Sequence, residues 1–217
     1  MALITVIGAS GRQAVVVDID EDEETLYPFF RYGGPKTLHY ALRATYWPGI
    51  AIIPANLGLY DAEYEFAARM AREPAFILDR LREGIQTIED QFDIILLDPP
   101  PALGMLSLSV LRAANALLIP APPNNIDFGS TAHFLKMLET TSAELARHGG
   151  ERSYHFVKIL ASKMNDQKSA HLAIKRMMDA VFPQDMLQAV LKDSAEIDNA
   201  TANLATVYEL TGAATRT

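Results

Sequence analysis

Short apolar runs alternate with stretches of helical periodicity along most of the chain. The runs cover residues 14–18, 50–53, 92–97, 116–120 and 154–160. The run at 92–97 does not alternate apolar with polar positions, a pattern typical of strands buried on both faces in the centre of a parallel sheet. Strands that alternate with helices favour an α/β fold with a doubly wound, mainly parallel sheet and helices on both faces. We therefore predict that these five strands run parallel in one sheet.

The remaining pattern predicts helices and two further strands. Helices are expected near residues 37–44, 61–72, 75–90, 105–115, 127–147, 169–182 and 197–204, and strands at 2–7 and 186–190. The first strand runs into Gly8 and Gly11, a weak sign of a dinucleotide-binding fold. The strand at 14–18 follows too soon for the crossover helix that such a fold requires. We expect a hairpin or a disordered start instead.

The run at 92–97 ends abruptly in Asp98, and Pro99–Pro101 follow it. Proline cannot extend a hydrogen-bonded ladder, so the strand should stop there. Open α/β sheets bind their ligands at the carboxyl ends of strands. A carboxylate at that position can hold a hydrated Mg²⁺ beside a nucleotide phosphate. Spacing alone is equally compatible with a strand that merely stops at an Asp-Pro turn.

Composition narrows the class of protein. The chain has 217 residues, of which 49% are apolar and 21% charged, which predicts one folded domain over residues 1–217. It has no cysteine, which excludes disulfides, thiolate metal sites and a cysteine nucleophile. The sequence shows neither a signal peptide nor a membrane-spanning apolar stretch, so a cytoplasmic location without membrane contact is expected.

The net charge of −8 is spread unevenly. Residues 1–100 hold 16 acidic and 8 basic side chains, whereas residues 101–217 hold 11 of each. Residues 147–192 carry eight basic and four acidic side chains, an excess of four positive charges. Such an excess suits either a DNA-contacting face or an ordinary solvated helix surface. The candidate DNA contacts are Lys163, Lys168, Lys175 and Arg176.

Several motifs point to one family. The most specific is the segment 98–107, Asp-Pro-Pro-Pro-Ala-Leu-Gly-Met-Leu-Ser, and others lie at 53–57, 60–65, 118–123, 127–131 and 206–209. Together they resemble the ParA family of plasmid-partition ATPases, especially the subgroup encoded with plasmid replication genes. The resemblance covers most of residues 14–210 and implies a fold like that of the P-loop NTPases.

The resemblance also implies an activity and partners. Members of this family bind ATP and Mg²⁺ between two subunits, bind DNA non-specifically on the nucleoid, and respond to a ParB-like centromere-binding protein. By resemblance, Asp98 would hold the metal through water and Asp20 would orient the attacking water. The other implied nucleotide-site residues are Asp18, Pro122, Asn165 and Asp166. A homodimer, or a heterodimer with an intact relative, is the implied assembly.

One departure from the family changes this expectation. No Gly-x-x-x-x-Gly-Lys-Ser/Thr loop, which cradles phosphates with backbone N–H groups and a lysine, occurs in the sequence. The segment Gly33–Thr37 is only a mimic, because it lacks the second glycine and Pro35 removes an N–H donor. The acidic residues 20–24 would also repel a triphosphate unless metal ions intervene. We therefore expect a fold that is incomplete at its amino end and inactive as an isolated chain.

Two other functions remain open. The chain could be a catalytically inactive interaction module that keeps the fold and pairs with an intact paralogue or with the centromere-binding partner. More remotely, Asp98-Pro99-Pro100 resembles the catalytic motif of nucleic-acid adenine methyltransferases. Those enzymes need an aromatic residue next, to stack on a flipped base, and this chain has Pro101.

Overall fold

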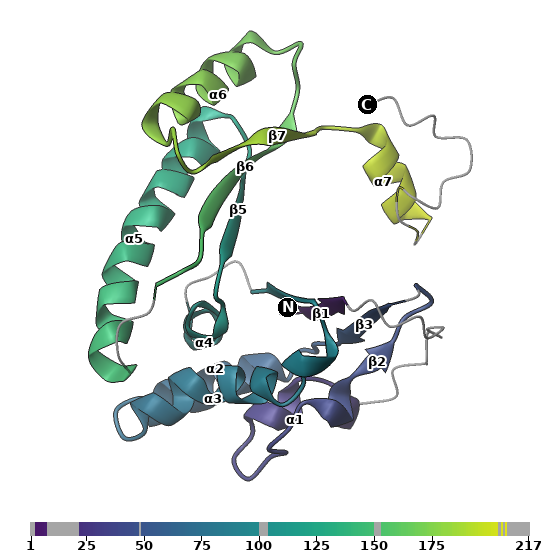
Figure 1. Ribbon diagram of the computed structural model, residues 1–217, viewed down its shortest axis with the longest axis vertical. Helices are drawn as coiled ribbons and strands as arrows, with labels where there is room; N and C mark the ends of the chain where they lie inside the picture. Colours follow the sequence, from purple (N-terminus) through teal and green to yellow (C-terminus); the bar gives the residue numbers. More distant parts are fainter. Residues whose placement is uncertain are drawn as a thin grey trace. The chain divides into compact units, whose positions relative to one another are not determined.

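In a computed structural model of the chain, the described residues are 3–7, 22–47, 49–99, 104–149, 153–203, 205 and 207 (Figure 1). The chain divides into two compact units, residues 1–115 with 141–153 and residues 116–140 with 154–217. The single domain expected over residues 1–217 stays a prediction. Among the described residues, no helix is long and apolar enough to cross a membrane.

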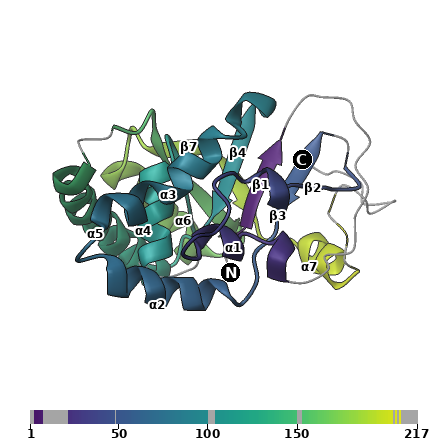
Figure 2. The same ribbon diagram turned by 90° about the horizontal axis from the view of Figure 1, so that it is seen from below.

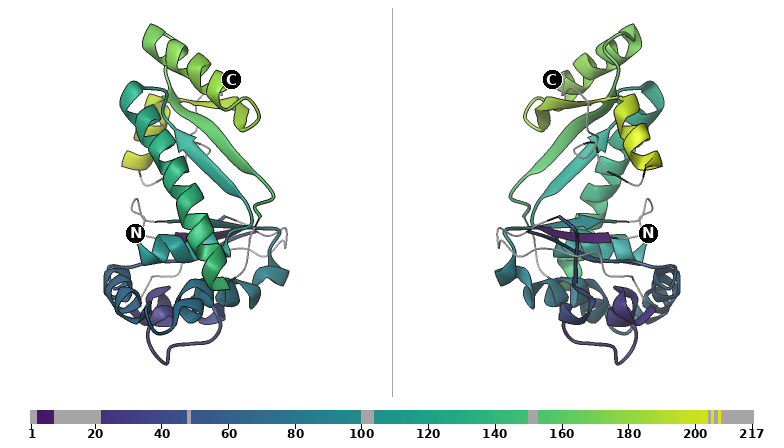
Figure 3. Two further views of the ribbon diagram at one scale, coloured as in Figure 1. Left: turned by 90° about the vertical axis from the view of Figure 1, so that its left-hand side faces the viewer. Right: turned by 90° about the vertical axis from the view of Figure 1, so that its right-hand side faces the viewer.

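The first unit combines four strands with short helices. Its strands are β1 (Leu3–Ile7), β2 (Arg43–Ala44), β3 (Ile50–Ile53) and β4 (Ile94–Asp98). Its α-helices are α1 (Tyr27–Phe30), α2 (Leu59–Arg69), α3 (Pro74–Gln86) and α4 (Met105–Ala113), with 3-10 turns η1 (Asp22–Glu24), η2 (His39–Ala41) and η3 (Glu89–Gln91). In Figure 3 the helices α1–α3, purple to blue, lie on one side of the purple strand β1.

The strands of the first unit form a sheet in the order β2-β3-β1-β4. Figure 2 shows β1 beside β4, and Leu3 pairs with Asp98 at one end while Ile7 pairs with Ile94 at the other. Strand β1 is antiparallel to both β3 and β4, so these two strands run in the same direction. The predicted parallel relation of 50–53 to 92–97 is therefore confirmed. The chain start predicted at 2–7 adds an antiparallel strand between them.

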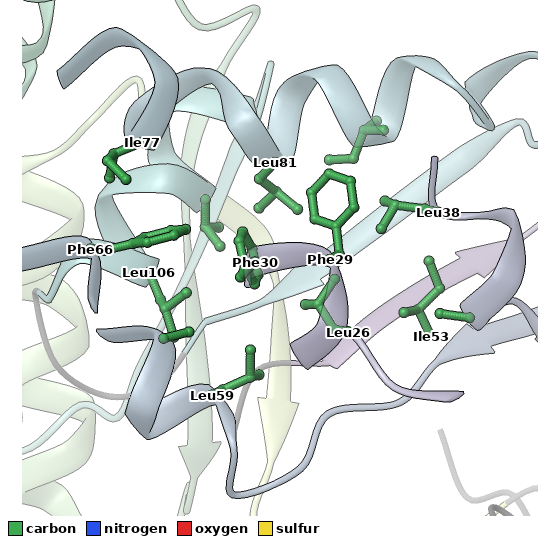
Figure 4. Packing of buried hydrophobic residues seen from close by; sticks show 14 of the residues in the cluster. Leu26, Phe29, Phe30, Leu38, Ile53, Leu59, Phe66, Ile77, Leu81 and Leu106 are labelled. Carbon is green, nitrogen blue, oxygen red and sulfur yellow. The ribbon is translucent and has the colours of Figure 1, made fainter. Parts of the chain in front are cut away.

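The core of the first unit is packed by large aromatic and aliphatic side chains. Phe29, Phe30 and Phe66 are completely or almost completely buried, and Phe30 contacts the other two rings edge to face. Figure 4 shows these rings beside Leu81 and Leu106, which come from α3 and α4. The short helix α1 therefore occupies the centre of this core. Both phenylalanines of residues 27–30 face this core from the same short helix.

Two local predictions in the first unit were inaccurate. The helix expected near residues 37–44 is the 3-10 turn η2 followed by strand β2, whose residue Arg43 pairs with Ile52 of β3. The helix expected near residues 61–72 begins and ends earlier, because α2 runs from Leu59 to Arg69. Pairing with a neighbouring strand overrides helix propensity in the first case.

The described elements of the second unit are β5 (Leu117–Ala121), β6 (Val157–Met164), α6 (Ser169–Val181), β7 (Met186–Lys192) and α7 (Ala195–Ala202). Helix α5 (Asn125–Gly149) begins in this unit, and its residues from 141 onwards belong to the first unit. The sheet order is β5-β6-β7 and both pairings are parallel. The side chains of Phe128 on α5 and Met178 on α6 pack into one cluster with Ile159 of β6. This parallel sheet with flanking helices confirms the α/β class.

Three sequence expectations need correction or stay open. Of the five strands predicted to share one parallel sheet, the four that are described lie in two sheets, because β4 pairs with β1 and β5 pairs with β6. The strand at 92–97 was expected to be buried on both faces, yet Ile94 and Leu96 of β4 are exposed. Only the face that carries Ile95 and Leu97 packs against the core. The strand predicted at 14–18 lies outside the described residues.

Burial of Tyr40 gives the first unit a measurable pH dependence. The Tyr40 hydroxyl donates a hydrogen bond to the backbone oxygen of Thr25 at 2.9 Å, and burial raises the pKa of Tyr40 to about 12. Its ordinary pKa is about 10. A folded-state pKa above the unfolded value contributes stability that is present below pH ~10 and is lost as pH rises towards ~12.

We predict that Tyr40→Phe lowers the free energy of unfolding by about 1 kcal/mol at neutral pH, through loss of this hydrogen bond. The variant should also lose less stability than the wild type between pH ~10 and ~12. Urea unfolding followed by circular dichroism over this pH range measures both effects. Tyr64→Phe is the matched control, because Tyr64 is 77% exposed and its substitution should not change stability at neutral pH. Equal pH profiles for wild type and Tyr40→Phe would contradict the assignment.

Candidate functional site

Asp98 is the last residue of β4, and its side chain is exposed. It therefore stands at the carboxyl end of a strand, as the sequence predicted. The next described residue after Pro99 is Gly104, one residue before helix α4 begins. A carboxylate at a strand end, close in sequence to a helix start, is positioned to bind a cation or a hydrated metal.

The amino terminus of α4 carries a carboxylate that sequence reasoning missed. Glu63 on α2 accepts hydrogen bonds from the backbone N–H groups of Met105 and Leu106, the latter at 2.9 Å. These are the orphan N–H groups of the first helical turn. The positive end of the helix dipole adds to the attraction for this negative charge. Glu63 therefore caps α4 from another helix.

Gly104 makes this capping contact sterically possible. A Cβ atom added at Gly104 would collide with the Glu63 carboxylate. Helix α4 is also tied to α3, because Arg112 forms an ion pair with Asp79 at 2.9 Å and the Ser109 hydroxyl donates to the backbone oxygen of Ile77 at 3.1 Å. Polar contacts from α2 and α3 thus hold α4, the helix that begins within the family-specific segment 98–107.

In the second unit, three predicted nucleotide contacts lie at one edge of the sheet. Pro122 follows Ala121 of β5, which pairs with Ala161 of β6, and Asn165 follows the end of β6. Parallel strands place their carboxyl ends at the same edge. The structure therefore brings Pro122 to the same sheet edge as Asn165 and Asp166. Whether this edge contacts a nucleotide stays a prediction.

The polar groups of Asn165 and Asp166 already have partners within the chain. The Asn165 side-chain oxygen accepts the N–H of Gln167 at 3.0 Å, and the Asn165 N–H donates to Nδ1 of His171 at 3.3 Å. Asp166 forms an exposed ion pair with Lys192 at 2.9 Å. Asn165 therefore builds the turn between β6 and α6, and its side-chain nitrogen is the group left for a ligand.

Lys163 sits in a strained position near the end of β6. Its φ angle is 50°, in the left-handed region that side-chain-bearing residues seldom adopt. Ala161 pairs with Val190 and Met164 with Lys192, so three steps along β6 match two along β7. The extra residue makes a β-bulge, a feature that commonly redirects a side chain at a functional edge. The Lys163 side chain is exposed there.

The other three predicted DNA contacts lie at or on α6. Lys168 precedes the helix and is exposed, whereas Lys175 forms an i,i+4 ion pair with Asp179 at 2.6 Å. Arg176 is exposed and donates to the backbone oxygen of Leu172. Within the described part of the chain, Lys163, Lys168 and Arg176 have no ion-pair partner. These three cations are therefore better placed than Lys175 to contact phosphate.

The remaining candidate residues add no described contact to the site. Asp18 and Asp20 lie outside the described residues. Lys36 is exposed in the segment after α1, where the N–H of Gly34 donates to the backbone oxygen of Arg31 and the Pro35 oxygen accepts from Arg80. Gly33–Thr37 thus forms a turn between a helix and η2, not a loop between a strand and a helix. The Gly34 N–H and the Pro35 oxygen have intrachain partners, and the segment lacks the strand-to-helix setting of a phosphate loop.

No three candidate ligands converge as a metal site among the residues the structure describes. Asp98 supplies one carboxylate, but Asp18 and Asp20 are not described and Asp166 is engaged with Lys192. Of the acidic site residues predicted from the sequence, Asp98 is the described one that lies on β4. Two sequence features point to the capping role of Glu63, a carboxylate on an adjacent helix and a glycine just before α4. Both are weak signals.

A sequence model of the AAA domain family matches residues 8–148. The chain is 27% identical over 191 residues to a putative replication protein A of Rhizobium rhizogenes, a match that covers 86% of this chain and 47% of that protein. It is 29% identical over 189 residues to protein SopA of Escherichia coli K12, covering 86% and 48% respectively. The chain thus spans about half the length of the curated relatives it matches.

Solved structures give a consistent result. A structure titled partition protein superposes with a TM-score of 0.64 at 25% identity, covering 77% of this chain and 48% of that one. An ATP complex of a Cyanothece McdA variant gives a TM-score of 0.56 at 22% identity, covering 73% and 59%. At this second level of identity, the likeness establishes the fold alone.

We predict that Glu63→Ala destabilises the chain by about 1 kcal/mol, because it leaves two helix N–H groups without their acceptor. Glu63→Gln should be milder, since the amide oxygen can still accept one hydrogen bond although the charge is lost. Chemical denaturation gives the free energies. Glu139→Ala, at an exposed position on α5, is the control and should be close to neutral. A neutral effect of Glu63→Ala would mean that α4 does not depend on this cap.

Proposed function

We propose, on the premise that this chain belongs to the AAA-domain family of ParA-like partition ATPases, that it serves in DNA partition without turning over ATP by itself. The observation that carries the proposal is the segment 98–107, which begins with Asp98. It has the partition-type sequence, it begins at the carboxyl end of β4, and it leads into a helix held by Glu63.

The residues present do not fit a bound nucleotide triphosphate. Phosphate binding in this class of fold requires loop amides and a lysine, and the 217 residues contain no such loop. The nearest mimic, Gly33–Thr37, is a turn between α1 and η2 in which the Gly34 N–H and the Pro35 oxygen have intrachain partners. Asp98 supplies a negative charge, which attracts Mg²⁺ but repels phosphate. We therefore assign no catalytic step to Asp98 or Asp20 in the isolated chain.

DNA contact is the part of the family activity that this chain can support alone. Lys163, at the bulge near the end of β6, and Lys168, the residue before α6, are two exposed lysines on either side of the β6–α6 connection. Arg176 adds an exposed cation on the same helix. Contacts to phosphate carry no sequence information, so binding should be non-specific. A nucleoid-associated, cytoplasmic protein is consistent with this proposal.

A second candidate is an inactive interaction module. The missing phosphate loop favours it, because a chain that keeps the fold without the phosphate site can still offer surfaces to partners. Those partners would be a ParB-like centromere-binding protein or an intact relative of the same family. Co-purification with an intact relative, combined with no turnover by this chain alone, would favour this module over an independent ATPase.

We predict no ATP binding by the isolated chain at micromolar nucleotide with Mg²⁺, and no measurable turnover. Each missing charge-assisted hydrogen bond removes about 1.5–3 kcal/mol, and about 1.4 kcal/mol is a tenfold change in affinity. Losing several of them weakens binding by many orders of magnitude. Isothermal titration calorimetry is the measurement, with Asp98→Ala as the control. Micromolar binding that Asp98→Ala abolishes would show that a phosphate cradle exists and would overturn this prediction.

We predict that the chain binds duplex DNA with an affinity that falls steeply as salt rises, because phosphate contacts release counterions. Lys163→Gln combined with Lys168→Gln should weaken binding to all sequences alike and reduce the salt slope by about two contacts. Lys192→Gln is the matched control, because Lys192 is also exposed but is paired with Asp166. Fluorescence anisotropy over a salt series measures the slope. Salt-independent binding, or preference for one sequence, would contradict the proposed face.

A further inference from the structure

A hydrogen bond between Asn165 and His171 joins the end of β6 to the first turn of α6. The N–H of Asn165 donates to Nδ1 of His171 at 3.3 Å. Asn165 is the first residue after β6, and His171 lies in the first turn of α6. The bond therefore spans the connection formed by residues 165–168, which ends in the proposed DNA contact Lys168.

The other contacts of the connection are local to the turn or lie on β7. The backbone oxygen of Asn165 accepts the N–H of Lys168 at 3.1 Å, and its side-chain oxygen accepts the N–H of Gln167 at 3.0 Å. At the end of β6, the N–H of Asp193 donates to the backbone oxygen of Met164 at 2.9 Å. The strand end is thus anchored to β7 through Met164 and to α6 through His171.

The anchor on α6 bears on the strained residue two positions before Asn165. Lys163 has a φ angle of 50°, and a strained backbone persists only where the surrounding structure holds it. The pairing with β7 holds the bulge from one side. The bond to His171 fixes the chain just after the bulge. If that bond is lost, the connection can relax, and the exposed side chains of Lys163 and Lys168 lose their fixed separation.

This hydrogen bond exists in one protonation state of His171. A neutral imidazole whose Nδ1 accepts a hydrogen bond carries its proton on Nε2. Protonation at Nδ1 turns the acceptor into a donor, so it would face the Asn165 N–H with a second N–H group. The hydrogen bond is then lost. Histidine is the side chain that ordinarily changes charge between pH 5 and 8.

The charged side chains beside this contact come from β6, the connection, α6 and the end of β7. They are Lys163, Asp166, Lys168, Lys175, Lys192 and Asp193. Asp166 pairs with Lys192, and Lys175 pairs with Asp179. A protonated His171 would add a positive charge near Lys168 at the amino terminus of α6, where cations destabilise a helix. Charge repulsion and loss of the hydrogen bond therefore both loosen the connection.

We propose that His171 is a positioning residue for the DNA contacts, which it holds in place when neutral and releases when protonated. The inference rests on the proposed function, because Lys163 and Lys168 are the side chains that it positions. His171 acts through the backbone of Asn165 and does not itself need to touch phosphate.

The direct test is solvent exchange of the Asn165 amide in the full chain, measured by NMR from pH 8 to pH 5 and divided by the intrinsic exchange rate at each pH. Protection in the wild type should fall by about fivefold towards pH 5, the factor expected for one hydrogen bond. His171→Ala should lack this protection at both ends of the range. His171→Asn is the conservative variant, because its side-chain oxygen can accept the same bond and does not titrate, so its protection should not depend on pH.

The second test is binding of duplex DNA at pH 8, followed by fluorescence anisotropy. His171→Ala should weaken binding by about fivefold, whereas His171→Asn should bind like the wild type. His155→Asn is the matched control, because His155 is an exposed histidine before β6 in the same unit, and this variant should follow the wild type in both tests. Circular dichroism melting would verify that the variants fold.

Two outcomes would overturn the proposal. The first is an Asn165 amide whose protection is unchanged by pH in the wild type or by His171→Ala. The second is a chain that binds DNA equally well with and without His171. Failure of the proposed function gives a different result, in which no variant binds DNA although protection of the Asn165 amide still follows protonation of His171. That result would support the hydrogen bond as a pH-sensitive anchor and refute its role in DNA contact.

Discussion

Backbone hydrogen bonding is the constraint on which both sheets of this chain depend. Every N–H and C=O group in a strand needs a partner, and leaving them unpaired in a folded interior is costly. In the first unit, β1 meets this need for two neighbours at once, because it pairs with both β3 and β4. Strand β1 runs antiparallel to both neighbours, so this unit of α/β type contains an antiparallel strand. The helices α1–α3 can then pack on a continuous sheet.

The second constraint acts at the start of α4. A helix amino terminus exposes N–H groups, and Glu63 accepts two of them across the space between two helices. The same carboxylate keeps the positive end of this helix occupied from within the chain. Because α4 begins within the segment 98–107, the contact holds the helical end of that segment against α2. An interaction that looks like ordinary capping therefore positions the most family-specific part of the sequence.

Hydrophobic periodicity predicted the helices and strands well, and their mutual arrangement less well. The strands at 50–53, 92–97, 116–120 and 154–160 and the helix at 75–90 all correspond to observed elements. The sequence could not indicate that β1 would insert between two parallel strands, because strand pairing depends on distant partners. Of the candidate site, the strand-end position of Asp98 followed from the apolar run and the prolines. The role of Glu63 could not be foreseen, since its partners lie 42 and 43 residues away.

Two apolar residues of β4, Ile94 and Leu96, are exposed, which the sequence pattern did not predict. An apolar run without alternation is the pattern of a strand covered on both faces, and the described residues cover only one face of β4. Solvent exposure of Ile94 and Leu96 costs free energy that burial against another surface would recover. The apolar pattern of 92–97 therefore calls for a second covering surface that the described residues do not supply.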